Sequence, residues 1–456
     1  METVPDLSES LRNLGAIGPV PAAAWDGPRR WWHGPLDVEG LAIGSVQAAA
    51  TALNALTASR RYQVSAVRTA HSFDSLGHLR IDGRPAVGFA SLSGFRRTSD
   101  GWIRLHANYP HHAARLLEAL SLSAEGQVAG ALLDLTALEA EALINAGGGV
   151  AAAVRSRAAW IDAPGHGAVA SLPWIDTHPA PGPAPAGKQW RPSSDPGRPL
   201  LGLRVLDLTR VIAGPTATRL LGALGADVLR IDPPQIPELP DAFIDSGFDK
   251  RSAVADFGNA GDLERVRGLA ATADVVVLGY RAGALESFGL DAQALAQDRG
   301  DVIVATLSAW GAGPWGQRRG FDSLVQAASG IAAGYGTTND GGWRPGALPV
   351  QALDHATGYG LAAAVLALLA ERQANGRGGV ARMSLARTAE ELFRLGPAGG
   401  EGTDSPLPEP DYRQMDSTHG VLRLVGPPLT VDGSPLGYST APVTYGSSEP
   451  AWLSRP

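Results

Sequence analysis

The chain has 456 residues, of which 44% are hydrophobic and 18% are charged, so it can bury a large core and two or three domains are expected. Its formal net charge of −7 argues against a broadly basic surface for nucleic acid. The absence of cysteine excludes disulfides, thiolate metal sites and cysteine nucleophiles.

The first region, residues 1–178, is predicted to form a smaller α+β domain. An Ala-rich segment at residues 41–58 predicts a helix. Residues 92–108 predict two strands joined by a turn at Ser99-Asp100-Gly101. Further helices are expected at residues 111–120 and 135–145.

Three histidines of this region, His106, His111 and His112, lie close together in the sequence. No carboxylate stands near them at ligand spacing, so we expect a turn that opens a helix and no metal site. The N-terminus has no apolar signal core, and the most apolar segment, residues 358–372, is short for a membrane span. A cytoplasmic location is therefore expected, with neither membrane nor nucleic acid as a partner.

Residues 179–199 are rich in proline and predict an extended linker. The next region, residues 200–395, alternates apolar strands with helices, which indicates an α/β fold with a doubly wound, parallel, Rossmann-like sheet. The strands are expected at residues 204–208, 227–231, 274–278 and 301–307, and the helices between them at 216–224, 261–273 and 290–297.

Ligands of such sheets bind beyond the carboxyl ends of the strands, which points to the loops at residues 210–215 and 280–283. No GxGxxG motif follows the first strand, so a nicotinamide dinucleotide is not supported. The tail, residues 396–456, is predicted to be rich in loops, with short strands.

A weak internal repeat links the two regions. Leu36-Asp37, an Ala-rich helix and VSAVRTA (64–70) resemble Leu353-Asp354, its Ala-rich helix and MSLARTA (383–389). A duplication and a merely shared composition are both consistent with this pattern.

Asp354 opens the helix after residue 353, and two interpretations of it remain open. As an N-cap, its side chain would accept backbone N–H bonds of the first turn. As a nucleophile, it would be kept ionised by the helix N-terminus and would attack an activated acyl group. Four glycines (Gly336, Gly341, Gly342 and Gly346) would then let a thioester approach the backbone and would offer N–H donors.

Lys250 and Arg251 form a small basic island. It predicts either a solvated loop or a phosphate clamp at the ligand edge of the sheet, where an arginine gives two-pronged contacts.

Residues 201–389 resemble the class III CoA-transferases, a family that is related to the 2-methylacyl-CoA racemases. The motifs that carry the resemblance are RVLDLTRVIAGPTATRLLGALGADVLRID (204–232), DKRS (249–252), VVVLGYRAGALESFGL (275–290), GFDSLVQAASGIAAGYG (320–336) and LDHATGYG (353–360). The N-terminal part resembles the family's small domain, which comes later in the usual chain order, so a rearranged order is expected.

The resemblance implies a CoA-transferase that moves CoA between carboxylic acids through a covalent aspartyl intermediate. It implies that Asp354 is the catalytic residue, that Arg251 binds the nucleotide phosphates of CoA with Lys250 beside it, and that Val211 and Ala213 contact CoA. The substrates would be an acyl-CoA and a carboxylic acid, with no permanently bound cofactor and no metal.

Three departures from the family pattern bear on this expectation. Ile212 replaces a glutamine near the small acid, which disfavours oxalate, and Ser287 replaces a basic residue of the CoA clamp. Phe321 stands where the racemases carry a histidine, and racemisation needs two groups to move a proton. A racemase, isomerase or lyase on the same scaffold, and a CoA-binding relative without catalysis, are the alternatives.

The resemblance also implies an interlocked homodimer. The Ala-rich helix after Asp354 needs a cover, and a linker of about twenty residues reaches roughly 60 Å when extended. The N-terminal region can therefore pack on its own sheet domain or on that of a partner.

Overall fold

A seven-stranded sheet forms the centre of the computed structural model, which describes residues 4–182, 189–398 and 406–455. Residues 183–188 of the predicted linker lie outside the described residues. The strands, in spatial order, are β11 (Lys250–Val254), β10 (Asp227–Asp232), β9 (Arg204–Leu208), β12 (Val275–Leu278), β13 (Ile303–Ser308), β16 (Gly379–Ser384) and β8 (Asp176–Pro179).

All pairings among the first six strands are parallel, and only β8 runs antiparallel to its neighbour β16. Numbered along the chain, the six parallel strands lie in the order 3-2-1-4-5-6, which is a doubly wound arrangement. The predicted α/β fold with a mostly parallel sheet is therefore confirmed.

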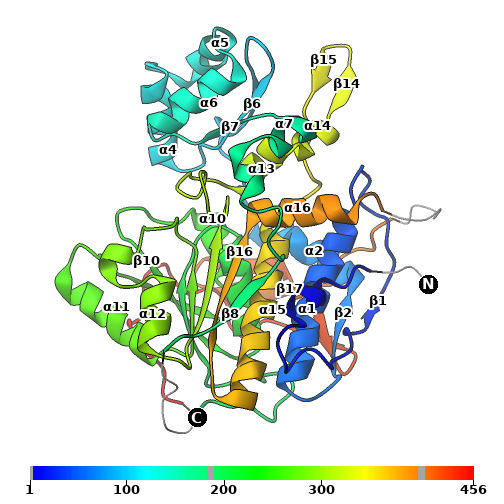
Figure 1. Cartoon of the computed structure of the whole chain (residues 1–456), viewed down its shortest axis with the longest axis vertical. Helices are drawn as coiled ribbons and strands as arrows, with labels where there is room; N and C mark the ends of the chain where they lie inside the picture. The colour runs from blue at the N-terminus through cyan, green and yellow to red at the C-terminus, as the bar shows by residue number, and fades with distance from the viewer. Residues whose placement is uncertain (1–3, 183–188, 399–405, 456) are drawn as a thin grey trace.

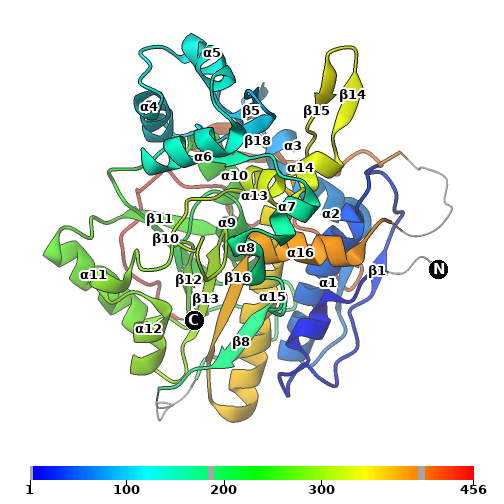
Figure 2. The ribbon, with the colours of Figure 1, turned by 45° about the horizontal axis from the view of Figure 1, so that its top comes forward.

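Helices cover both faces of this sheet, and successive strand residues face opposite cores. In β9, Val205 belongs to the core formed with α9 (Ala213–Ala223) and α15 (Ala352–Asn375). The next residue, Leu206, belongs to the core formed with α11 (Ala260–Thr272) and α12 (Ala292–Asp298). Figures 1 and 2 show α11 and α12 on one side of the strands and α15 on the other.

Helix α15 is covered along its length by α1 (Val38–Leu56) of the N-terminal region, and the two lie side by side in both views. Helix α15 is apolar and long enough to cross a membrane, but its most apolar window is entirely buried inside the protein. The chain thus supplies its own cover for α15. The need for a cover consequently gives no support to an exchanged dimer, and the homodimer stays a prediction.

Both members of the weak repeat have the same order of elements. Helix α1 leads into β2 (Tyr62–Ser65) and α2 (Ala66–Phe73), just as α15 leads into β16 and α16 (Leu385–Leu395). The C-terminal tail returns to the first member, because β19 (Leu429–Val431) pairs with β2. The predicted domain boundaries stay predictions, but strands from both sides of them share sheets.

A small lobe stands above the carboxyl ends of the parallel strands in Figure 1. Its three-stranded sheet contains the predicted hairpin, and its own core is formed by side chains such as Ile103, Leu116 and Ile144. Its elements are β5 (Gly94–Arg97), β6 (Trp102–Leu105), α4 (Pro110–Ala119), α5 (Val128–Leu133), α6 (Ala137–Ala146) and β7 (Ala151–Ala153). Strands β6 and β7 pack against α13 (Asp322–Ser329), so the lobe forms a roof over the sheet edge.

The remaining elements are short or peripheral. The helices are η1 (Leu7–Leu11), α3 (Ser75–His78), η2 (Glu125–Gln127), α7 (Arg157–Ile161), α8 (Pro164–Gly167), α10 (Pro240–Ser246), η3 (Glu286–Phe288) and α14 (Ile331–Gly334). The strands are β1 (Trp25–Asp26), β3 (Arg80–Ile81), β4 (Arg84–Pro85), β14 (Thr337–Asn339), β15 (Gly342–Arg344), β17 (Tyr412–Ser417), β18 (Gly420–Val425) and β20 (Ser434–Pro435).

Candidate active site

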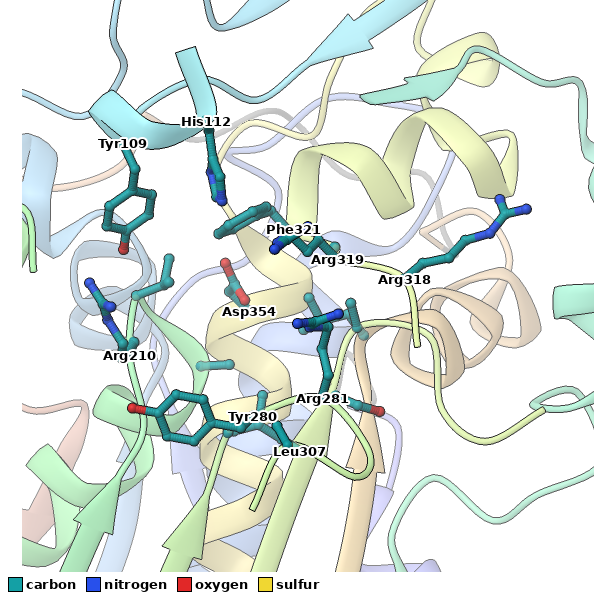
Figure 3. Close-up of a pocket in the computed structure, with 18 of the residues that line it drawn as sticks. Tyr109, His112, Arg210, Tyr280, Arg281, Leu307, Arg318, Arg319, Phe321 and Asp354 are labelled. Atoms are coloured by element: carbon teal, nitrogen blue, oxygen red, sulfur yellow. The ribbon is translucent and has the colours of Figure 1, made fainter. Parts of the chain in front are cut away.

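A cavity of about 250 Å³ lies between the carboxyl edge of the sheet and the small lobe. Its floor comes from the loops after β9, β12 and β13, which contribute Val211, Gly279 and Ala309 among others. Tyr109 and His112 of the small lobe form part of its roof (Figure 3). The loops that the sequence singled out, at residues 210–215 and 280–283, both contribute to this cavity.

Asp354 lines the cavity from the first turn of α15. The N-cap of this helix is Gln351, so the interpretation of Asp354 as the N-cap is wrong. Asp354 is only 6% exposed. Among the described residues, no donor forms a hydrogen bond to its carboxylate. Figure 3 shows this carboxylate pointing into the cavity, below Phe321.

A second buried carboxylate, Asp322, lies next to Asp354 at the start of α13. Asp322 Oδ2 accepts a hydrogen bond of 2.9 Å from the backbone N–H of Asp354, and Asp322 Oδ1 accepts one from the side chain of Gln326. Burial raises the pKa of Asp322 to about 6. Burial, and then the charge of Asp322, raise the pKa of Asp354 well above its ordinary value. Asp354 is thus a carboxylate with poor solvation and a repelling neighbour, which favours reaction with an electrophile.

The loop that carries Val211 is strained and firmly held. Val211 has a φ of +70°, which is an outlier for a β-branched residue. Its backbone N–H donates a hydrogen bond of 2.9 Å to Glu238. Burial would raise the pKa of Glu238, but Arg230 and Arg210 outweigh this effect and lower the pKa to about 2. The hydroxyl of Tyr109 also donates to Glu238, so one ionised carboxylate ties the roof to the floor.

Four arginines line the cavity, and the sequence reasoning assigned none of them a role: Arg210, Arg281, Arg318 and Arg319. Arg318 forms an ion pair with Glu141. Among the described residues, neither Arg281 nor Arg319 has a carboxylate partner within ion-pair distance. Partial burial and the charges of Arg281 and Arg115 lower the pKa of Arg319. Positive charges that repel one another at a cavity provide a site for a phosphate or another anion.

Two of the three histidines that were predicted to form a turn opening a helix line this cavity, and the third packs against Phe321. His111 and His112 lie in the first turn of α4 and line the cavity, and the ring of His106 stacks on Phe321 with centroids 3.5 Å apart. Burial lowers the pKa values of His106 and His112 to about 3, so both rings are neutral. Within the part of the chain that the structure describes, no group of His, Asp and Glu side chains could hold a metal ion.

Lys250 does not reach the cavity. Its ammonium group is buried beneath the loop after β9, where it donates hydrogen bonds to Asp207, the Pro215 carbonyl and Thr218 at distances from 2.6 to 3.2 Å. Burial lowers its pKa to about 8. Lys250 therefore supports the junction of β9 and α9, and direct contact with CoA is not supported by this position.

Arg251 lies at the opposite end of the sheet from the cavity. It is the second residue of β11, and the amino ends of parallel strands point away from the ligand edge. Its side chain forms an ion pair of 2.7 Å with Asp227, the first residue of β10, and a hydrogen bond of 2.7 Å to the Ala451 carbonyl. This position gives no support to the predicted phosphate clamp, which stays a prediction, and Arg251 ties the C-terminal tail to the sheet.

The four glycines expected to offer N–H donors lie in and around the β14–β15 hairpin, which projects from the body of the molecule in Figure 1. They do not line the cavity, so this expectation is wrong. A side chain at Gly346 would instead clash with the Tyr335 carbonyl, so this glycine serves the turn. Val211 and Ala213 line the cavity, and their contact with CoA stays a prediction, while Ser287 lies in η3, outside the lining.

Two of the arginines at the site could have been predicted from the sequence. Arg210 and Arg281 stand in or at the loops predicted to bind the ligand, so strand polarity alone could have selected them. Arg319 and His112 are more than two hundred residues apart and meet only through the packing of the small lobe on α13. Neither has a local sequence pattern that predicts this meeting.

Comparison with known proteins supports the family resemblance for the part of the chain that contains most of the central sheet. Residues 200–395 match the model of CoA-transferase family III. This match confirms the family resemblance for these residues, while the rearranged order of the remaining parts stays a prediction.

Three curated relatives illustrate the range of the match. A probable fatty acyl-CoA transferase of Mycobacterium tuberculosis is 35% identical over 239 residues, which are 48% of this chain and 59% of the relative. The human succinyl-CoA:glutarate CoA-transferase is 32% identical over 203 residues, which are 41% and 46% of the two chains. A formyl-CoA:oxalate CoA-transferase of Streptomyces coelicolor is 30% identical over 207 residues, which are 43% and 50%.

The chain thus spans about half of the length of the curated relatives that it matches. A crystal structure of a hypothetical protein from Mycobacterium tuberculosis is 35% identical, with a TM-score of 0.41, over 44% of this chain and 57% of that one.

Proposed function

We propose that this chain is a CoA-transferase that moves CoA between carboxylic acids through a covalent intermediate on Asp354. The observation that carries this proposal is a buried carboxylate without a hydrogen-bond donor, at a helix N-terminus, facing a cavity lined by arginines. The named relatives are transferases of CoA groups, which supports the same reaction class. Acyl-CoA and the free acid are substrates, and the reaction as proposed uses no resident cofactor.

The chemistry needs one nucleophile and no net proton transfer. An Asp354 oxygen attacks the thioester carbonyl carbon of the donor, the C–S bond breaks, and CoA leaves as a thiolate. The thiolate then attacks the aspartyl carbon of the mixed anhydride, which releases the donor acid as a carboxylate and leaves an aspartyl-CoA thioester. The acceptor carboxylate attacks this thioester, and the same two steps run in reverse, giving the new acyl-CoA and free Asp354.

The environment of Asp354 suits these steps. The N-terminus of α15 places positive partial charge near a carboxylate that must be ionised to attack. Arg281 and Arg319 line the same cavity without a carboxylate partner among the described residues, which supports a role in binding the phosphates of CoA. These two arginines take over the role that the sequence reasoning gave to Arg251.

The direct test is to trap the intermediate. The protein is incubated with acyl-CoA donors, and the peptide that contains Asp354 is examined by mass spectrometry for a CoA or acyl adduct. Wild-type protein and Asp37→Asn, which alters a carboxylate at the start of α1, are expected to form the adduct, whereas Asp354→Asn forms none. An adduct on another residue, or transfer by Asp354→Asn, would overturn the proposal.

A second candidate is exchange of the proton next to the thioester carbonyl. Phe321 cannot carry a proton, but His112 lines the same cavity as Asp354 and could supply the second group. The pKa of about 3 makes His112 a weak base, so CoA transfer is the better supported reaction. Uptake of deuterium from D2O into a 2-methylacyl-CoA, lost in His112→Asn, would establish proton exchange instead.

A further inference from the structure

A second, smaller cavity is also lined by Asp354. Its volume is about 80 Å³, and it shares Tyr109, Val211, Phe321 and Asp354 with the larger cavity. Asp354 therefore stands between two spaces. A thioester carbonyl placed at Asp354 would have its CoA arm in one space and its acyl chain in the other.

The two spaces differ in charge. The larger cavity has the four arginines, whereas no lysine or arginine is found among the described residues that line the smaller one. Its ionisable lining groups are Asp322, Asp354, Glu238, Tyr109 and the neutral His106. A second carboxylate on the acyl chain would meet like charge there and would find no cation to bind.

The smaller cavity is also short and mostly apolar. Its apolar lining consists of Leu76, Phe89, Val211, Ile212, Leu239, Ala242 and Phe321. An apolar cavity of about 150 Å³ holds benzene, so by proportion a space of this size takes roughly three carbon atoms. The space therefore fits the chain of a propionyl or butyryl group and has no room for a fatty acyl chain.

We propose that this smaller cavity is the acyl subsite and that it selects short, uncharged, monocarboxylic acyl groups. This inference rests on the proposed transferase function, since it assigns the acyl class to the same nucleophile. It leaves out the fatty acyl, succinyl, glutarate and oxalate groups in the names of the three relatives, and of the groups in those names it includes only formyl.

Leu239 contributes to the length limit. Together with Tyr109 and Glu238, it lines both the smaller cavity and a separate apolar cavity of about 520 Å³, and it is the aliphatic side chain of the three. The side chain of Leu239 is half-buried and forms part of the wall between the two cavities. Shortening this side chain would join the two spaces and make room for a long chain.

The test compares kcat/KM for acetyl-, propionyl-, butyryl-, octanoyl- and succinyl-CoA as donors, with one fixed acceptor. In the wild-type protein we expect butyryl-CoA to exceed octanoyl- and succinyl-CoA by about 10–200-fold, the range for a misfitting chain in an apolar pocket. Leu239→Ala should raise the octanoyl-to-butyryl ratio at least about tenfold. Leu138→Ala, which shortens an exposed leucine of α6 in the small lobe, is the control and should leave the ratio unchanged.

A variant with a larger side chain, which would fill the smaller cavity, tests the proposal if Leu239→Ala does not fold. Leu239→Trp should reduce butyryl transfer relative to acetyl transfer. A wild-type preference for octanoyl- or succinyl-CoA, or ratios that neither Leu239 variant changes, would overturn the acyl subsite while the transferase function stands. Absence of transfer from every donor would instead overturn the transferase function.

Discussion

The starts of α1 and α15 each have a buried aspartate, but the two carboxylates have very different surroundings. Asp37 and Asp354 are buried almost equally, at 7% and 6% exposure. Asp37 is the N-cap of α1, accepts a hydrogen bond of 2.7 Å from the backbone N–H of Gly40 and forms an ion pair with Arg29. Asp354 follows an N-cap, faces the carboxylate of Asp322 and opens onto a cavity. Burial alone therefore does not identify a reactive carboxylate, whereas the partners of the group do.

The same contrast separates the arginines. Arg251 is held by Asp227 and by the Ala451 carbonyl, far from the cavity. Arg319 lies at the cavity and is repelled by Arg281 and Arg115. A paired charge contributes to the structure, and an unpaired charge at a cavity is available to a substrate.

The largest difference between Asp37 and Asp354 is expected when the charge of each carboxylate is removed. Asp354→Asn is expected to lower kcat for CoA transfer by on the order of 10⁴-fold or more, because an amide cannot form the anhydride. Asp37→Asn should keep kcat within about threefold, because Asn is also a good N-cap. Steady-state kinetics of both variants decide this, and equal losses in the two would break the comparison.

Stability should respond in the opposite way. Asp37→Ala removes a cap and one partner of a buried ion pair, so we expect the free energy of unfolding to fall by roughly 2–4 kcal/mol, with Glu39 near Arg29 limiting the loss. Asp354→Ala should cost less than about 1 kcal/mol, because it also removes a carboxylate repelled by Asp322. Urea unfolding of the two variants measures the difference, and a larger loss for Asp354→Ala would contradict it.

The arginine pair extends the contrast to binding. Arg319→Ala is expected to weaken CoA binding about tenfold, near 1.4 kcal/mol, the loss of one partly exposed charged contact. Arg251→Ala should leave the affinity unchanged while loosening the C-terminal tail. Isothermal titration with CoA and with its 3′-dephospho form provides the measurement. Weaker binding in Arg251→Ala alone would restore the original phosphate-clamp hypothesis.

The smallest expected effect concerns pH. Asp354 must be ionised to attack, and its raised pKa means that kcat/KM falls as the pH decreases through that pKa. Asp322→Asn removes the neighbouring negative charge, lowers the pKa of Asp354, and should move the acid limb by about one unit toward lower pH. Profiles of kcat/KM between pH 5 and pH 9 test this, and an unmoved limb would remove Asp322 from the account.

The same raised pKa values make a statement about stability. A carboxyl whose pKa is higher in the folded protein than in the unfolded chain favours folding most when it is protonated. The contribution of Asp322 is therefore complete below about pH 4 and is lost as the pH rises through about 6.

The sequence was sufficient for the sheet and the position of its ligand loops, because apolar strands such as residues 275–278 and their spacing depend on local patterning. It was also sufficient to single out Asp354, with a nucleophile as one of the two interpretations that remained open. It failed for Arg251, because two charged residues at the start of β11 interrupt the apolar run and hide the strand. Because that strand was not predicted, its direction, which places Arg251 near the amino-terminal edge of the sheet, could not be inferred.

The rest of the site depends on long-range packing. His112, Tyr109 and Arg319 acquire their roles only when the small lobe covers the sheet edge, and no spacing rule links them. The backbone of Val211, which has a positive φ, is likewise held by Glu238, a residue on another loop. Tertiary contacts of this kind are invisible to periodicity and to short motifs.

The pairing of α1 with α15 inside one chain also has a genetic consequence. In a symmetric homodimer every substitution appears twice, once in each copy, so two equivalent helices cannot change separately. Here the two helices are encoded by different stretches of a single chain. A mutation can therefore change the start of α1 without changing the start of α15. The structural role of Asp37 and the reactivity of Asp354 can then be optimised independently.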